Sequence, residues 1–306
     1  MTEKTEFQYI KHQDIDYEKW DACIDGSINS RIYANTWHLD RTATYWDALV
    51  LGDYEFVMPL PIRKKFGIRY LYQPIFSQQL GIYPTPTSNI TRQFYHYLDK
   101  HFRYAKIHLN AGNLPAKEVA SMSFEPKKNY LLPLAGNYHD ISKFFSSNTK
   151  RIINKAGKQQ LSVIQGIRLE TYLEFKAKNL QSELPNSSMA TLKNIIAYGQ
   201  YKGFGEIYGV YSPDNELCAA VYFCQWKDRV IYLNAVSSEL GKSLGGMYFL
   251  INEFIKQHAG KNLTLDFEGS ILPGVARFFA GFGATPETYF QLHFNRLPLP
   301  LKWIKR

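Results

Sequence analysis

Two stretches of the chain share the same order of alternating apolar and polar positions. Residues 47–83 predict a strand, a Gly-Asp turn, a second strand, a basic turn and a longer strand rich in Tyr and Ile. Residues 205–236 repeat this order, with a Pro-Asp-Asn turn and a Lys-Asp-Arg turn between the strands. The pattern therefore predicts two meanders of three strands each.

A helix and a further strand follow each meander. Apolar side chains recur at helical spacing in residues 90–103, and the strand AKIHLNAG comes next. Residues 245–258 and the strand NLTLDFEGS occupy the same places in the second half. Each half then closes on a similar segment, residues 123–134 and 281–294. Agreement over so many successive elements indicates two copies of one α/β unit.

The repeat divides the chain into two predicted domains, residues 1–137 and 138–306. Antiparallel strands joined by short turns, followed by a helical crossover, give a mixed sheet with helices on its faces. This is the element order of the GNAT N-acyltransferase fold. The predicted fold class is thus α/β (α+β), with two tandem GNAT-like domains, each a mixed, largely antiparallel sheet flanked by helices. A generic two-domain α+β protein is the alternative.

Composition narrows the class of protein. Of the 306 residues, 45% are hydrophobic and 21% charged, which is typical of a globular protein with a large core. The polar start lacks the apolar segment of a signal peptide, and no run of about 18 apolar residues predicts a membrane span. Cys23, Cys218 and Cys224 have no metal-binding spacing, so no metal site is expected. Cys218 and Cys224 are expected to be buried in a protein of the reducing cytoplasm.

The net charge of +9 favours acidic partners such as phosphates, nucleic acid or an anionic membrane surface. A basic helix is predicted within residues 139–166, where the two halves meet. Its Arg151, Lys155 and Lys158 lie at i, i+4 and i+7 and share one face. An arginine fork matches phosphate or carboxylate oxygens. The stripe predicts either an anion site or a solvated helix surface.

The order of three segments resembles the FemAB family, the peptidyltransferases of the cell-wall precursor bridge. The segments are ANTWHLDRTATYWDALV, NTKRIINKAGKQQLSV and LDFEGSILPGVARFFAGFGA. Members of that family are two fused GNAT-like domains that attach amino acids from aminoacyl-tRNA to a UDP-linked muropeptide without coenzyme A. The resemblance implies that Arg151 contacts substrate phosphate and that Trp37 and Arg41 contact substrate, Arg41 standing where the family has a lysine.

Two positions depart from the family pattern. Phe279 stands where the family has an essential lysine, and Asn110 stands where it usually has an aspartate. A lysine ammonium stabilises the charge that develops on the ester during transfer, whereas a phenyl ring does not. An amide keeps the hydrogen bonding of a carboxylate but cannot act as a base. These departures argue against the tRNA-dependent reaction as such and leave the expected fold unchanged.

The candidate site is a crevice between the two halves, together with the strand ends of the second half. Asp266 and Glu268 end the strand LTLDFEGS on one face, and either carboxylate could accept a proton from the acceptor. For Asp266 we favour the alternative that it caps the turn or pairs with a basic neighbour. Tyr232 and Asn234 share a face of the strand VIYLNAV and are expected to line the same crevice, with core packing as an equal alternative for Tyr232.

A glycine-rich segment after VIYLNAV keeps coenzyme A open as part of the donor. Lys242, Gly245 and Gly246 form K-S-L-G-G, a partial version of the Q/R-x-x-G-x-G/A turn whose N–H groups hold a pyrophosphate. Tight packing is the alternative role of these glycines. The candidate donors are therefore acyl-CoA and aminoacyl-tRNA, and no further cofactor is predicted.

The predicted function is an acyl- or aminoacyl-transferase acting on a cell-envelope or polysaccharide precursor. The acceptor is expected to be an anionic small molecule, UDP- or phosphate-linked. The alternatives are a catalytically silent GNAT-fold binding module and an acyl-CoA-dependent N-acetyltransferase. The basic and aromatic segments RKKFGIR and LKWIKR leave RNA or peripheral membrane contact open, whereas DNA is not expected. The sequence does not decide the oligomeric state.

Overall fold

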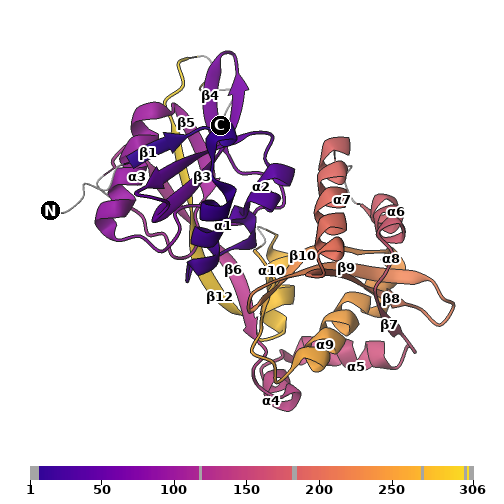
Figure 1. The fold of residues 1–306 in the computed structure, drawn as a ribbon. Coiled ribbons are helices and arrows are strands. Elements are labelled where there is room, and N and C mark those ends of the chain that lie inside the picture. Colours follow the sequence, from indigo (N-terminus) through magenta and orange to yellow (C-terminus); the bar gives the residue numbers. More distant parts are fainter. Residues whose placement is uncertain (1–6, 117–118, 181–184, 270–271, 300–301, 303–306) are drawn as a thin grey trace. The chain divides into compact units, whose positions relative to one another are not determined.

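The computed structural model describes residues 7–116, 119–180, 185–269, 272–299 and 302. Contacts along the chain divide it into two compact units, residues 1–127 with 288–306, and residues 128–287. Each unit is a mixed sheet flanked by helices, which confirms the predicted fold class (Figure 1).

The first unit carries the early elements of the chain and its last strand. In chain order they are β1 (Phe7–Ile10), η1 (His12–Asp14), α1 (Tyr17–Gly26), η2 (Ile32–Ala34), α2 (Thr36–Thr42), β2 (Trp46–Leu51), β3 (Phe56–Lys65), β4 (Ile68–Tyr72), α3 (Ser88–His101), β5 (Tyr104–His108), the start of β6 (Ser123–Pro133) and most of β12 (Thr285–Asn295). The strand order is β1-β2-β3-β4-β5-β12.

The second unit carries the rest of β6, the start of β12 and the elements between them. These are α4 (Tyr138–Lys143), α5 (Ser147–Gly157), β7 (Ser162–Gln165), α6 (Leu169–Asn179), α7 (Asn186–Tyr201), β8 (Gly205–Tyr211), β9 (Leu217–Trp226), β10 (Arg229–Ser237), α8 (Glu239–Leu244), α9 (Gly246–His258), β11 (Thr264–Asp266) and α10 (Pro273–Gly281). The strand order is β6-β11-β10-β9-β8-β7.

The predicted repeat is visible in the strand pairing. The meander β2-β3-β4 corresponds to β8-β9-β10, and each meander is followed by a helical crossover to a parallel neighbour, β5 beside β4 and β11 beside β10. Both copies also have an additional antiparallel edge strand, β1 or β7, that the sequence pattern did not predict. Four-residue edge strands are too short to show a clear alternation.

The closing strands are exchanged between the two copies of the repeat. β6 follows the first copy but pairs with β11 of the second, and β12 follows the second copy but pairs with β5 of the first. The compact units therefore differ from the sequence repeat, because each completes its sheet with a strand of the other copy. The division of the repeat at residues 137 and 138 stays a prediction.

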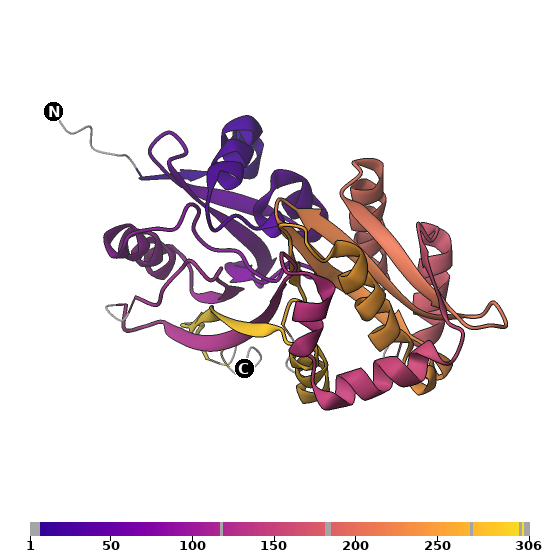
Figure 2. The ribbon, with the colours of Figure 1, turned by 90° about the horizontal axis from the view of Figure 1, so that it is seen from below.

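The core of the second unit lies between its sheet and α9. The buried strand β9 is apolar on both faces, with Cys218 and Cys224 fully buried, and Leu250 and Phe254 of α9 pack against this sheet. Figure 1 shows α6 and α7 on the opposite side of the sheet from α9 and α5. In the view of Figure 2, α5 runs alongside α9. The sheet is thus covered by helices on both faces, which buries its central strands.

Asn and Ser side chains cap the first turns of two helices in the second unit. Asn137 caps α4 by accepting a hydrogen bond from the N–H of Asp140, and Ser146 caps α5 by accepting one from the N–H of Thr149. These side-chain oxygens satisfy N–H groups that have no partner within the helix.

Among the helices of the described residues, none has both the length and the apolar character needed to cross a bilayer.

Candidate functional site

The two parallel strands of the second unit separate beyond their last paired residues. β10 and β11 pair only as far as Ile231 and Asp266, after which β11 ends and β10 continues to Ser237. A bulge at Leu233 shifts the register of β10 against β9 between Tyr232 and Asn234. Bulges bend a strand and redirect its side chains. The result is an opening in the sheet between β10 and the end of β11.

A pocket of about 750 Å³ occupies this opening. Its volume falls in the range of small-molecule sites, about 300–1,000 Å³. The lining residues come from the end of α6, from β10, from α8 and α9, from the turn after β11, and from α10; they include Asn179, Leu180, Tyr232, Asn234, Lys242, Gly245, Tyr248, Glu268, Phe278 and Phe279. Because α6 and α9 lie on opposite faces of the sheet (Figure 1), the pocket reaches wall residues from both faces.

Asn234 is held at the pocket by a buried tyrosine. The hydroxyl of Tyr172 on α6 donates to Asn234 Oδ1 at 2.7 Å and lies 3.2 Å from the Asn234 carbonyl oxygen. Burial raises the pKa of Tyr172 well above its usual value, so this hydroxyl stays protonated. With Oδ1 of Asn234 accepting from Tyr172, the Asn234 amide NH₂ is oriented as a donor.

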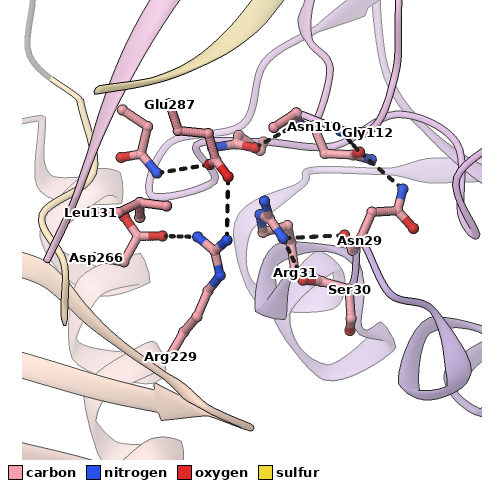
Figure 3. A network of polar contacts seen from close by, with 12 residues as sticks. Asn29, Ser30, Arg31, Asn110, Gly112, Leu131, Arg229, Asp266 and Glu287 are labelled. Carbon is pink, nitrogen blue, oxygen red and sulfur yellow. Dashed lines mark hydrogen bonds and ion pairs between the residues drawn. The ribbon is translucent and has the colours of Figure 1, made fainter. Parts of the chain in front are cut away.

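Glu268 and Asp266 have different surroundings. Glu268 lines the pocket and is half-buried, and its backbone adopts φ +57°. Asp266 is only 2% exposed; its carboxylate accepts from Arg229 at 2.8 Å and from the Glu268 N–H at 2.9 Å. Arg229 also reaches Glu287 at 3.4 Å, as Figure 3 shows. Asp266 therefore pairs with a basic neighbour and holds the turn that presents Glu268, whereas Glu268 is the carboxylate at the pocket.

The glycines between α8 and α9 meet specific packing demands. Gly245 adopts φ +72°, which favours glycine, and a Cβ there would lie 2.8 Å from Ile152. A Cβ on Gly246 would lie 3.3 Å from the carbonyl oxygen of Gly241. Gly245 lines the pocket, and α9 begins directly after it. Lys242 lines the pocket at its exposed side and is paired with Glu239 at 2.5 Å. The segment from Lys242 to Gly246 therefore packs tightly, as one alternative predicted, and also contributes Lys242 and Gly245 to the pocket lining.

Phe279 belongs to the apolar wall of the pocket and to the core. Its ring stacks on Phe267 with centroids 4.8 Å apart, and Tyr232 packs on both rings. Tyr232 therefore serves in core packing and also lines the pocket. Burial raises its pKa, so the phenol remains neutral. A lysine at position 279 would have to extend its ammonium out of this aromatic cluster, because burying the charge among apolar rings is costly.

The cationic stripe of α5 lies outside this pocket. Arg151, Lys155 and Lys158 are exposed, and none of them is among the pocket-lining residues. Arg151 donates to Asn148 at 2.9 Å on its own helix. In the structure these side chains form a solvated helix surface, one of the two alternatives predicted for the stripe. Their part in substrate binding stays a prediction.

Trp37 and Arg41 lie on α2 of the first unit. Both are half-buried, and Arg41 donates to the Trp37 carbonyl at 2.7 Å. Its guanidinium carbon also lies 6.0 Å from the centre of the Trp37 ring. These two residues form one local contact. Their role toward substrate stays a prediction.

Asn110, in the first unit, is a structural residue. It is fully buried, and its Nδ2 donates to the carbonyl oxygens of Leu80 and Ile82 at 3.0 and 3.2 Å. Its Oδ1 accepts from the Gly112 N–H and from the amide of Asn29, both at 3.0 Å (Figure 3). An aspartate could not donate to the two carbonyls. The neutral side chain at this position therefore follows from its hydrogen-bond partners.

Sequence reasoning missed the pocket wall contributed by α6. Asn179 and Leu180 line the pocket, and Lys176 on the same helix is 4% exposed. A signal was present in the sequence, since Lys176 falls at i+4 from Tyr172, on the face that an amphipathic helix turns inward. A lysine on that face is unusual, because lysines are rarely buried without a partner.

Comparisons with solved structures find the same architecture. FemX aligns with a TM-score of 0.67 and 12% identity over 97% of this chain and 99% of the other. The C-terminal domain of a putative lysylphosphatidylglycerol synthetase from Agrobacterium fabrum aligns at 0.55 and 9% identity, covering 95% of this chain and 94% of that one. The chain has a FemAB-like GNAT fold. A GNAT-family acetyltransferase from Colwellia psychrerythraea aligns at 0.55 and 14% identity, over 95% and 100% of the two chains.

The FemAB-like GNAT fold is recognised by structure alone. No protein-family model matches the sequence, and no curated protein sequence matches it. Identities of 9–14% establish the arrangement of helices and strands and leave the chemistry to the residues of the site.

Proposed function

We propose that the protein is a GNAT-type acyl- or aminoacyl-transferase whose acceptor is a cell-envelope or polysaccharide precursor. The observation that carries this proposal is the pocket at the separation of β10 and β11, with Glu268 and Asn234 at its wall. A cytoplasmic location is part of the proposal, and the free thiols of Cys23, Cys218 and Cys224 support it because they are compatible with a reducing compartment.

The pocket offers the groups that an acyl transfer requires. The nucleophile of the acceptor must lose a proton, and the carboxylate of Glu268 is the proton acceptor in this proposal. The donor carbonyl must be held beside that nucleophile, and the amide of Asn234, oriented by Tyr172, is a hydrogen-bond donor for it. The aromatic wall of Phe278 and Phe279 excludes water from the reacting groups.

The proposed donor is an acyl-CoA or an aminoacyl-tRNA. Gly245 lines the pocket at the start of α9, and the first N–H groups of a helix favour a phosphate. Lys242 lies at the same end of the pocket. These residues fit an anionic part of either donor, with the acyl group extending toward Asn234 and Glu268. We propose that the backbone N–H of Gly246, the first residue of α9, binds the same anionic part of the donor.

The proposed acceptor class draws on the comparisons. The fold of this chain is similar to those of FemX and the putative lysylphosphatidylglycerol synthetase, which supports a transferase of this kind. The net charge of +9 favours an anionic acceptor, such as a UDP- or phosphate-linked precursor. Arg151, Lys155, Trp37 and Arg41 are proposed to contact that precursor. An anion on the exposed face of α5 would be attracted by Arg151 and Lys155 together.

Thermal unfolding with added ligand tests the proposal. A ligand present at about 100 times its Kd stabilises the folded state by about 2.7 kcal/mol. We expect acetyl-CoA, a longer acyl-CoA or alanyl-tRNA to raise the Tm, and a UDP-linked muropeptide to raise it independently. Arg151→Ala is expected to abolish the shift caused by the muropeptide and to leave the donor shift unchanged. No shift with any of these ligands would contradict the proposed substrates.

Replacing Glu268 with Gln is expected to lower kcat by about 10²–10⁴, because the amide cannot accept the proton. The donor-induced Tm shift should persist, since the side chain keeps its size. Steady-state kinetics with the donor identified by thermal shift gives the measurement, and Glu216→Gln, an exposed carboxylate in the turn between β8 and β9, is the control. Equal loss in both variants, or none in either, would remove Glu268 from the reaction.

A second candidate is a binding module that does not catalyse transfer. Phe279 favours it, because a phenyl ring stands in the aromatic wall of the pocket where the resemblance expects a lysine. In that case the pocket would bind donor or precursor, and Glu268→Gln would change affinity without any turnover to lose. Release of product in a donor screen separates the two candidates.

A further inference from the structure

The second unit contains a buried lysine for which the structure gives no partner among the described residues. Lys176 on α6 is 4% exposed and makes no hydrogen bond or ion pair within the described part of the chain. Burial lowers its pKa to about 8. A lysine side chain buried to this extent without a counter-charge adds no stability to the folded state, so a stability role does not explain this residue.

The position of Lys176 on α6 places it beside the pocket. Tyr172, Lys176 and Leu180 are spaced at i, i+4 and i+8, so they follow one another along one side of the helix. Tyr172 at one end of this row bonds Asn234, which lines the pocket, and Leu180 at the other end lines the pocket itself. Lys176 thus lies between two residues that both reach the pocket region.

The charges around Lys176 can be followed element by element. On α6 the titratable side chain on the buried face is Tyr172, whereas Glu174 and Lys178, two residues to either side of Lys176, are exposed. The inward residues of α7, Leu192, Ile195 and Ile196, are apolar. The pocket contributes Tyr232 from β10, Lys242 and Tyr248 from α8 and α9, and Glu268 after β11. Burial raises the pKa of each of these tyrosines, so they remain neutral. Burial is the cause of the shift at Lys176, without a contribution from these charges.

We propose that Lys176 supplies the positive charge that stabilises the donor carbonyl oxygen during acyl transfer in the pocket. The inference rests on the proposed function and adds a catalytic residue to it. Lys176 is not itself among the lining residues, so its side chain would reach the pocket from between Tyr172 and Leu180. The inference also accounts for the phenyl ring at position 279, because the required charge then comes from α6.

The step balances with Lys176 protonated throughout. The lone pair of the acceptor amine or hydroxyl forms a bond to the donor carbonyl carbon, and the C=O electron pair moves to the oxygen. That oxyanion faces the Lys176 ammonium, whose attraction is strong in a site with little water. The acceptor proton passes to Glu268. Collapse of the oxyanion re-forms the C=O bond and expels the leaving group, a thiolate or a ribose alkoxide, which takes the proton from Glu268.

Three variants test this inference through turnover. Lys176→Met keeps the length of the side chain without its charge and is expected to lower kcat by about 10²–10³. Lys176→Arg keeps a charge and is expected to recover part of the rate. Lys178→Met, two residues further along the same helix, removes an exposed lysine and is expected to leave the rate unchanged. Acetyl-CoA and alanyl-tRNA are the donors, and thiol or tRNA release is measured.

The pH profile separates a cation from a base. Because Lys176 must be charged, the rate of the wild-type protein is expected to fall as the pH rises through about 8, and Lys176→Arg should lose that fall. A rate that instead rises through the same pH would overturn the proposed role. Unchanged kcat in Lys176→Met would overturn it as well.

A second measurement does not depend on turnover. Labelling with an amine-reactive ester, followed by mass spectrometry, is expected to modify Lys176 in the folded protein with a rate that rises near pH 8. Bound acetyl-CoA should slow this labelling and leave Lys178 unaffected. If Lys176 stays unlabelled while Lys178 reacts, the amine is sealed from the pocket and the inference fails. If no donor binds or reacts with the wild-type protein while Lys176 is labelled, the proposed function fails instead.

Discussion

Replacing Arg229 with Met is expected to lower the free energy of unfolding by about 3–5 kcal/mol, because it leaves the buried carboxylate of Asp266 without a counter-charge. Asp266 is 2% exposed, and its 2.8 Å ion pair with Arg229 is the contact that neutralises it. Glu287 would lose its 3.4 Å contact with Arg229 in the same variant and keep the one with Asn129. Chemical denaturation, with the unfolding free energy extrapolated to water, gives the measurement.

Two further variants decide whether the buried charge is the cause. Arg229→Met combined with Asp266→Asn removes both charges and is expected to recover much of the loss, since the amide oxygen of the new side chain can still accept from the Glu268 N–H. Lys143→Met breaks the exposed pair with Asp140 and should cost at most about 1 kcal/mol. If the double variant is no more stable than Arg229→Met, packing of the arginine stem and not its charge explains the effect.

Replacing Asn110 with Asp is expected to destabilise the protein by about 3 kcal/mol or more at neutral pH. The new oxygen would face the carbonyl oxygens of Leu80 and Ile82, which now accept hydrogen bonds from Nδ2. The site is fully buried, so water cannot relieve this repulsion. The prediction is checked by denaturation, with Asn148→Asp, an exposed position in the first turn of α5, as the control. We expect the control to change stability by less than about 0.5 kcal/mol.

The pH dependence of the Asn110→Asp variant has a definite sign. Burial would raise the pKa of the new carboxyl in the folded state above its unfolded value of about 3.9. A carboxyl whose folded-state pKa is raised lowers the free energy of unfolding least when the pH is below its unfolded-state pKa. The free energy of unfolding then falls as the pH rises through the folded-state pKa. The variant should therefore lie closest to the wild-type protein near pH 4 and furthest from it above neutrality. A difference that is constant across this range would show that shape, and not charge, is responsible.

Several features of the site could be predicted from local sequence. Alternation correctly indicated the strand that carries Tyr232 and Asn234. The predicted strand before Glu268 is shorter than expected, because β11 ends at Asp266 and Glu268 lies in the turn after it at φ +57°. Tyr232, Asn234 and Glu268 all line one pocket. Gly245 and Lys242 were found from the glycine-rich segment and lie at the same pocket. Each of these belongs to a segment whose period is visible within about ten residues.

Other assignments needed contacts between distant segments. Nothing near Asp266 in the sequence shows that Arg229 is its partner; the parallel register of β10 and β11 brings them together. The stripe of Arg151 and Lys155 is correct as a helix face, but periodicity cannot tell an exposed face from a binding face. Lys176 was overlooked for a related reason, since its burial depends on the sheet against which α6 packs.

By itself, the sequence determined the two meanders with the helix and strand that follow each of them, the existence of two copies of one unit and the element order of a GNAT fold; it did not show the short edge strands β1 and β7. These properties depend on hydrophobic period and turn residues, which act over a few positions. Only the tertiary structure decided the exchange of β6 and β12, the separation of β10 from β11 and the contribution of α6 to the pocket. Each of these is a matter of pairing and packing between segments far apart in the chain, and the same local pattern is compatible with more than one such arrangement.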